Sequence, residues 1–139
     1  DEYLNLLATL GTQHGAFKRE TRKAYNRIVS EIYSPPRVTR MASMLPSLKV
    51  LPGYAFDITT NDPEDNEPWD FDLATKREKA RRLLREQQPL FLVGSPMCTA
   101  WCTWQRLNRL RRDPETCKRE RIKAQLHLDF VMQLYKEQI

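Results

Sequence analysis

Long apolar runs and cysteine are both scarce in this sequence, and each scarcity narrows the class of protein. No apolar run is long enough to cross a bilayer, which argues against a membrane-spanning protein. Cysteine occurs only as Cys98, Cys102 and Cys117, an odd set without the spacing of a small disulfide-rich domain. No internal repeat or low-complexity segment is present either. We therefore expect an intracellular protein, nuclear or cytoplasmic, with reduced cysteines.

Histidine is scarcer still, and this limits metal and hydrolase sites. Only His14 and His127 occur, and we expect both on the surface or on a helix face. Cys98 and Cys102 could bind zinc only together with His127 and Cys117. Because His127 and Cys117 lie in a basic amphipathic stretch, no metal is expected. Because no histidine is close to Cys98 in sequence, a Cys-His hydrolase is not indicated.

Positive charge is in excess and unevenly distributed. The chain has 23 Lys and Arg against 18 Asp and Glu, a formal net charge of +5. Basic residues crowd the segment 76–123, directly after the acidic segment 62–72. This asymmetry fits a protein that binds an anionic partner on one side, and solvated helix faces are the alternative interpretation.

The length of 139 residues gives room for one domain with a modest core. The composition of residues 1–25 predicts a leader rich in charge, in which we expect the stretch YLNLLATL to be helical. Because the chain begins with Asp1 and its last residues continue a helical pattern, we interpret it as a fragment. Residues 26–139 would then be the N-terminal half of a larger domain, truncated at its C-terminus.

Three short segments have the composition of strands. They are residues 28–33, 54–58 and 90–93. The dipeptide Pro52-Gly53 predicts a turn before the second strand. The continuous apolar run LFLV predicts a third strand that is buried on both faces.

Helical patterns separate and follow these strands. The first covers residues 37–45, and a second is expected to be capped by Thr75, with an apolar stripe of Ala80, Leu83 and Leu84. Between the second strand and this helix we expect an irregular surface loop anchored by Trp69 and Phe71.

Two more helices are expected in the C-terminal third. One begins near Thr99, where Trp101 and Trp104 fit core positions better than base-stacking ones. The next is capped by Asp113 with Pro114 in its first turn. The face that packs on the sheet in the last helix is expected to carry Ile122, Leu126, Phe130 and Leu134. Its opposite face would carry Lys118, Arg119 and Lys123.

The element order predicts the fold class. Strands that alternate with helices indicate an α/β protein with right-handed crossovers. We expect an incomplete Rossmann-like three-layer sandwich with a mainly parallel sheet and a helical C-terminal third. In such folds ligands bind beyond the carboxyl ends of the strands, here at YSPPR, DITT and GSPMC.

Two residues at these strand ends each have two interpretations. Asp57 either hydrogen-bonds ribose hydroxyls or accepts backbone N–H bonds within its turn. Cys98 is either a small packing residue or a nucleophile, whose thiolate the N-terminus of the helix at Thr99 would stabilise.

The motif SPMCTAWC resembles the catalytic motif of the DNA cytosine-5 methyltransferases, roughly Gly-Pro-Pro-Cys-Gln-Gly-Phe-Ser at the end of a core strand. Cys98 matches the family's nucleophile, Pro96 a motif proline and Trp101 its aromatic position. The stretch EIYSPPRV resembles the family's first motif, Asp-Leu-Phe before a glycine-rich turn. Asp57 would match the ribose-binding acid, and Asp70 with Phe71 the acidic-apolar pair that flanks adenine.

As an ordered set, YSPPRV, FDITT, PWDF and VGSPMCTA resemble more closely a methyltransferase-like domain of polyproteins in protist and fungal retrotransposons. The resemblance extends from about Arg27 to the C-terminus. It departs from the family at Pro35-Pro36, which replaces glycines, and at Met97 and Cys102, which replace a proline and a serine.

The resemblance implies methyl transfer from S-adenosylmethionine to a flipped cytosine that Cys98 attacks. The implied cofactor-binding residues are Tyr33, Ser34, Pro35, Asp57, Asp70, Phe71, Ser95 and Pro96. A nucleic acid, DNA in preference to RNA, would be the partner, held through its phosphates by Arg37, Arg106, Arg109 and Arg112. A non-catalytic nucleic-acid-binding or assembly module with the same fold is the alternative. The oligomeric state stays open.

Overall fold

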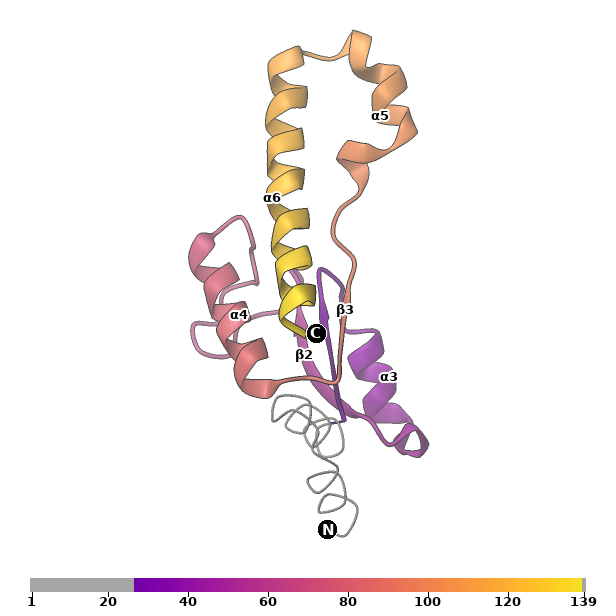
Figure 1. Cartoon of the computed structure of the whole chain (residues 1–139), viewed down its shortest axis with the longest axis vertical. Coiled ribbons are helices and arrows are strands. Elements are labelled where there is room, and N and C mark those ends of the chain that lie inside the picture. The colour runs from indigo at the N-terminus through magenta and orange to yellow at the C-terminus, as the bar shows by residue number, and fades with distance from the viewer. Residues whose placement is uncertain (1–26, 139) are drawn as a thin grey trace, which may run out of the picture.

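The computed structural model describes residues 27–138, so the predicted leader and His14 lie outside the described part (Figure 1). The described residues form one sheet from three parallel strands, β1 (Ile28–Ile32), β2 (Leu51–Phe56) and β3 (Phe91–Gly94). Their order in space is β2-β1-β3. The chain passes from the central strand β1 to β2 on one side, and then crosses to β3 on the other side of β1. The fold therefore has a topological switch between β1 and β3.

Helices cover both faces of this sheet (Figure 1). Helix α3 (Val38–Met44) joins β1 to β2 on one face, followed by the short turn η1 (Pro46–Leu48). Helices α4 (Ala74–Gln87) and α6 (Pro114–Gln138) lie on the other face. The α/β class and the parallel sheet are thereby confirmed.

The main core lies between the sheet and the helices α4 and α6. It contains Ile32 and Phe56 from the strands, Ala80 and Leu84 from α4, and Trp69, Phe71, Phe130, Val131 and Leu134. The Phe56 and Trp69 rings meet edge to face with centroids 4.6 Å apart. The predicted anchors of the surface loop and the predicted stripe of α4 are confirmed. Helix α4 begins at Ala74, and no side chain caps it, so the predicted Thr75 cap is wrong.

Strand β2 begins before the predicted turn, so Pro52 and Gly53 lie inside it. An edge strand tolerates a proline, and the pairing with β1 shifts register between Val29 and Glu31. The Ser30 hydroxyl fills this irregularity, because it accepts a hydrogen bond from the Tyr54 N–H at 3.1 Å. A Cβ at Gly53 would lie 2.2 Å from the Ser30 Oγ, which explains the glycine.

Strand β3 was predicted to be buried on both faces, and this is wrong. Phe91 is 63% exposed, and Val93 is exposed as well. The reason is that β3 lies at the edge of the sheet, whereas α3 packs on the neighbouring β1 and on β2. One face of β3 therefore stays exposed. Only Leu92 of its apolar residues packs against the main core.

Helix α6 begins as predicted, with the Thr116 N–H donating to the Asp113 carboxylate at 2.8 Å. Its buried face contains Phe130 and Leu134 as predicted, but it departs from the prediction nearer the N-terminus of the helix. Ile122 and Leu126 are exposed, whereas Ala124 and His127 are buried together with the core residues further along. Its first turns extend beyond the sheet, so the packed face starts only at Ala124 (Figure 1).

A helical arm projects beyond the carboxyl ends of the strands (Figure 1). We define the arm as residues 99–121: η2 (Thr99–Trp101), α5 (Thr103–Asn108), η3 (Arg109–Arg111) and the first turns of α6. The helix predicted to begin near Thr99 is thus a single 3-10 turn followed by a short helix. Trp101 and Trp104 were expected in the core, and both are exposed because no sheet lies beneath them.

Candidate functional site

The ends of all three strands meet at the carboxyl edge of the sheet. The Tyr33 N–H donates to the Phe56 carbonyl at 2.8 Å, and the Ser95 N–H donates to the Ile32 carbonyl at 3.1 Å. Three predicted cofactor-binding positions, Tyr33, Asp57 and Ser95, are therefore neighbours although they lie far apart in sequence. Their role toward a cofactor stays a prediction.

Tyr33 is held firmly at the end of β1. Its backbone has a positive φ of 56°, an uncommon conformation for a residue other than glycine. Its hydroxyl is hydrogen-bonded to His127 Nδ1 at 2.6 Å, and His127 Nε2 is in turn hydrogen-bonded to the Asp72 carboxylate at 2.9 Å. Burial raises the pKa of Tyr33 well above its usual value, so the phenol stays neutral.

His127 was expected on the surface or on a helix face. It lies on helix α6, but its side chain is buried and contacts Tyr33 and Asp72, so the surface alternative is wrong. The Phe71 ring packs against Tyr33, with centroids 5.0 Å apart, and is itself only 3% exposed. Little of Phe71 is therefore left to flank an adenine.

Asp57 fills one of the two roles that its sequence position suggested, that of an acceptor within its own turn. Its Oδ2 accepts hydrogen bonds from the Thr59 N–H at 3.1 Å and from the Thr59 hydroxyl at 2.6 Å, which fixes the turn after β2. Its other oxygen, Oδ1, accepts no hydrogen bond from residues 27–138 and could accept one from a ribose hydroxyl. Asp70 accepts from the Asp72 N–H at 2.9 Å and so shapes the end of the following loop.

Glu31 is a buried carboxylate that the sequence reasoning missed. It is 0% exposed, and its Oε1 accepts hydrogen bonds from the N–H groups of Arg37 and Thr39, both at 3.0 Å, and from the Thr39 hydroxyl at 2.6 Å. Oε2 accepts from the Val38 N–H at 3.3 Å. Burial alone raises the pKa of this carboxyl, but these hydrogen bonds outweigh burial and hold the pKa below its usual value. A lone acid within the apolar strand IVSEI was the available signal.

Glu31 decides how well S-adenosylmethionine fits this edge. The free Asp57 oxygen suits the nucleoside end of that cofactor. At the other end, the Glu31 carboxylate already occupies the N–H groups at the start of α3, and Pro35 and Pro36 have none. The Ser34 hydroxyl donates to the Pro35 carbonyl at 3.0 Å. The residues present therefore do not fit the methionine end of the cofactor.

Cys98 is exposed, three residues beyond Ser95, so it is not a packing residue. The predicted support for a thiolate is also wrong, since only the short turn η2 begins there. Among residues 27–138, no side chain hydrogen-bonds to the Cys98 thiol. Pro96, next to it in the motif, is half-buried. The site thus offers an accessible thiol without an activating partner.

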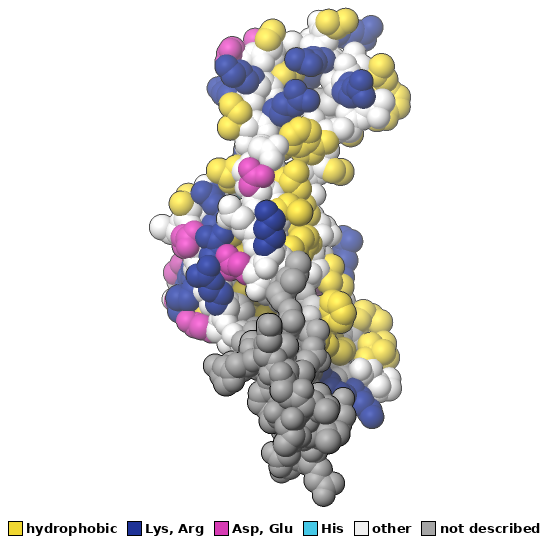
Figure 2. Space-filling view, viewed as in Figure 1, with side chains coloured by type: hydrophobic (Ala, Val, Ile, Leu, Met, Phe, Trp, Pro, Cys, Tyr) yellow, Lys and Arg dark blue, Asp and Glu magenta, His cyan; other side chains and the backbone are white. Residues whose placement is uncertain are grey.

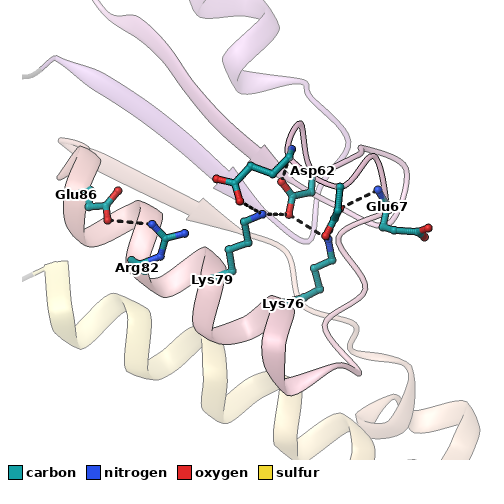
Figure 3. A network of polar contacts seen from close by, with 8 residues as sticks. Asp62, Glu67, Lys76, Lys79, Arg82 and Glu86 are labelled. Atoms are coloured by element: carbon teal, nitrogen blue, oxygen red, sulfur yellow. Dashed lines mark hydrogen bonds and ion pairs between the residues drawn. The ribbon is translucent and has the colours of Figure 1, made fainter.

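The loop between β2 and α4 is latched onto α4 by an ionic cluster (Figure 3). Asp62 is fully buried and accepts from Lys76 at 3.1 Å and from Lys79 at 2.5 Å. Burial raises the pKa of Asp62, but the hydrogen bonds from Lys79, the Glu64 backbone and Lys76 are stronger, and the pKa falls to about 2. The latch fixes the loop that carries Asp57 and Asp70, which the sequence predicted only as irregular.

The predicted phosphate-binding arginines lie in two places. Arg37 is exposed before α3, and the other three are on the arm. Arg106 and Arg109 are exposed, whereas Arg112 donates to Gln105 and pairs with Glu120, both at 2.6 Å, and so ties α5 to α6. Lys and Arg side chains gather on the arm in the space-filling view (Figure 2).

The described residues 27–138 also bear on the metal and membrane expectations. Within them, no three His, Cys, Asp or Glu side chains are grouped so that they could hold a metal ion. None of the helices there combines the length and the apolar character needed to cross a membrane. Comparisons of the chain with known protein families, with curated proteins and with solved structures found no match.

Proposed function

We propose that this protein is a nucleic-acid-binding module with an incomplete Rossmann-like, methyltransferase-type fold, and that the arm contacts the phosphate backbone. The arm has seven basic and three acidic residues, a formal charge of +4 within a chain of +5. Such a concentration of positive charge on one projection attracts a polyanion.

The pairing of the basic residues supports this proposal. In helix α4, five of the six basic residues form ion pairs with the preceding loop, with α4 itself or with Glu137 of α6, as in the bond from Arg85 to Glu137 at 2.9 Å. The sixth, Arg77, donates to carbonyls of the loop. Within the described residues, only Arg112 among the seven basic residues of the arm is in an ion pair. The positive charge of α4 therefore serves the fold, and that of the arm is available to a partner.

The test is binding to labelled DNA, followed by fluorescence anisotropy over a range of salt concentrations. The triple variant R106A/R109A/R111A should bind at least about tenfold more weakly than the unaltered chain, and the slope of log affinity against log salt should fall by about 2 to 3. A matched triple variant, R40A/K49A/R82A, removes the same charge from exposed residues of the body. If both variants lose affinity equally, binding follows net charge and the arm is not the site.

A second candidate is methyl transfer to cytosine by a DNA cytosine-5 methyltransferase-like protein, with Cys98 as the nucleophile and S-adenosylmethionine as the methyl donor. It is favoured by the convergence of Tyr33, Asp57 and Ser95 and by the exposed thiol. The unsuitable methionine end of the site weighs against it.

Two measurements test this candidate. Titration calorimetry with S-adenosylmethionine and with adenosine asks which part of the cofactor is recognised, and no heat with the cofactor would reject the candidate. Trapping on DNA that contains 5-fluorocytosine asks whether the thiol attacks. An adduct that still forms in Cys98→Ser would show that another group is the nucleophile.

A further inference from the structure

Two tryptophans of the arm lie on its surface. Trp104 is 73% exposed and Trp101 is 40% exposed, whereas Trp69 in the core is 3% exposed. An exposed indole gives up the favourable burial of a large apolar surface, and exposed aromatic groups commonly mark a binding surface. Because Trp101 and Trp104 are close in sequence, both rings lie on the basic arm.

Positive charge lies directly beside these rings. The Arg121 guanidinium of α6 lies over the Trp101 ring, 5.5 Å from its centroid. The turn η2 and helix α6 thus bring an aromatic face and a cation together at one place. Arg106 and Arg109 are exposed further along the arm.

We propose that Trp101 and Trp104 form a stacking platform for unpaired bases, so that the ligand of the arm is single-stranded nucleic acid. This rests on the proposed function and names its substrate class. Bases can stack on protein side chains only when they are not stacked within a duplex, and sites for single strands combine aromatic faces with a positively charged track. Exposed rings beside arginines that form no ion pair within residues 27–138 have this combination.

Charge complementarity selects this occupant over a second copy of the chain. Two arms, each with a formal charge of +4, repel each other when their tryptophan faces meet. A single-stranded nucleic acid can instead stack its bases on the rings while its phosphates contact the cations.

The experiment compares Trp104→Ala and Trp101→Ala with the unaltered chain in binding to labelled poly(dT) and to a DNA duplex. Loss of one stacked base should weaken poly(dT) binding between about 5-fold and 100-fold and leave duplex affinity unchanged. Trp104→Phe, which keeps an aromatic face, should retain most of the affinity. Leu107→Ala, at another exposed apolar position of the arm, is the matched control and should bind poly(dT) like the unaltered chain.

The outcomes separate this inference from the proposed function. If poly(dT) and duplex bind equally, and Trp104→Ala binds both like the unaltered chain while R106A/R109A/R111A weakens both, the function holds and the platform is refuted. If neither nucleic acid binds, the function itself fails. If Trp104→Ala dissociates a dimer in sedimentation velocity without a change in DNA affinity, the tryptophans serve self-association and the inference is overturned.

Discussion

Replacement of Glu31 by alanine should be the most damaging single change at the carboxyl edge. The carboxylate accepts three backbone N–H groups and one hydroxyl at the point where the chain leaves β1 and enters α3. No water reaches the fully buried side chain to take its place. Glu31→Ala therefore leaves several donors without an acceptor.

The magnitude follows from these contacts. A lost helix cap alone costs about 1 kcal/mol, and buried donors left without a partner cost about 1 to 3 kcal/mol each. Partial relaxation of the loop limits the sum, so we expect Glu31→Ala to lower the free energy of unfolding by about 3 kcal/mol. Glu31→Gln keeps the Oε1 bonds but turns an amide toward the Val38 N–H, and it should cost about half as much.

Urea unfolding, followed by the fluorescence of the buried Trp69, measures this loss. With a slope of about 1.5 kcal/mol per molar urea, the midpoint of Glu31→Ala should fall by about 2 M. Glu86→Ala removes an exposed glutamate of α4 and should stay within about 0.5 kcal/mol of the unaltered chain. A Glu31→Ala variant as stable as Glu86→Ala would refute the assignment of Glu31 as the anchor of α3.

The pH dependence gives an independent check on the same residue. Because the folded pKa of Glu31 lies below its ordinary value of 4.5, its ionised form stabilises the fold fully above that pH. This contribution is lost as the pH falls below 4.5 through the folded pKa. Glu31→Gln should therefore lose less stability than the unaltered chain over that acid range, and parallel curves would contradict the linkage.

Three further predictions concern contacts around the site. Asp62→Asn should flatten the acid unfolding curve between pH 3.8, the ordinary pKa, and about 2, the folded one, since the ionised carboxylate stabilises the loop latch above that range. An unchanged acid transition would show that the latch contributes no linkage. Gly53→Ala should destabilise the fold by about 1 to 3 kcal/mol through the clash with Ser30, and Ser30→Ala in the same chain should recover part of it in thermal unfolding. Failure of the double variant to recover would place the cost elsewhere. Tyr33→Phe removes the hydroxyl that is hydrogen-bonded to His127 and should cost about 1 kcal/mol in urea unfolding, and no loss would mean that water replaces the phenol hydroxyl.

The sequence predicted those features that depend on local pattern or on large apolar side chains. The strand and helix order, the Asp113 cap and the loop anchors Trp69 and Phe71 follow from such signals and are confirmed. The site prediction correctly brought Tyr33, Asp57 and Ser95 to one edge, because carboxyl ends of parallel strands meet.

The features it missed depend on what lies beside an element in space. The apolar run of β3 is the same whether its strand is central or at the edge, so burial on both faces could not be read from it. His127 is buried because Tyr33 and Asp72, from distant segments, satisfy both of its nitrogens. Likewise the exposure of Trp104 depends on how far α5 extends past the sheet, which periodicity does not report.

The carboxyl edge and the arm use their polar groups in opposite ways, and this contrast favours a binding module over a methyltransferase. At the edge, Glu31 holds the start of α3, the Tyr33 phenol is bonded to His127, and one oxygen of Asp57 fixes its own turn. These groups hold the fold together and leave few contacts for a cofactor. On the arm, most cations form no ion pair with the described residues, and both indoles are exposed, with only Arg121 over the Trp101 ring. Partner recognition should therefore survive loss of any cofactor contact at the edge, and Asp57→Ala should leave DNA affinity unchanged in the anisotropy assay.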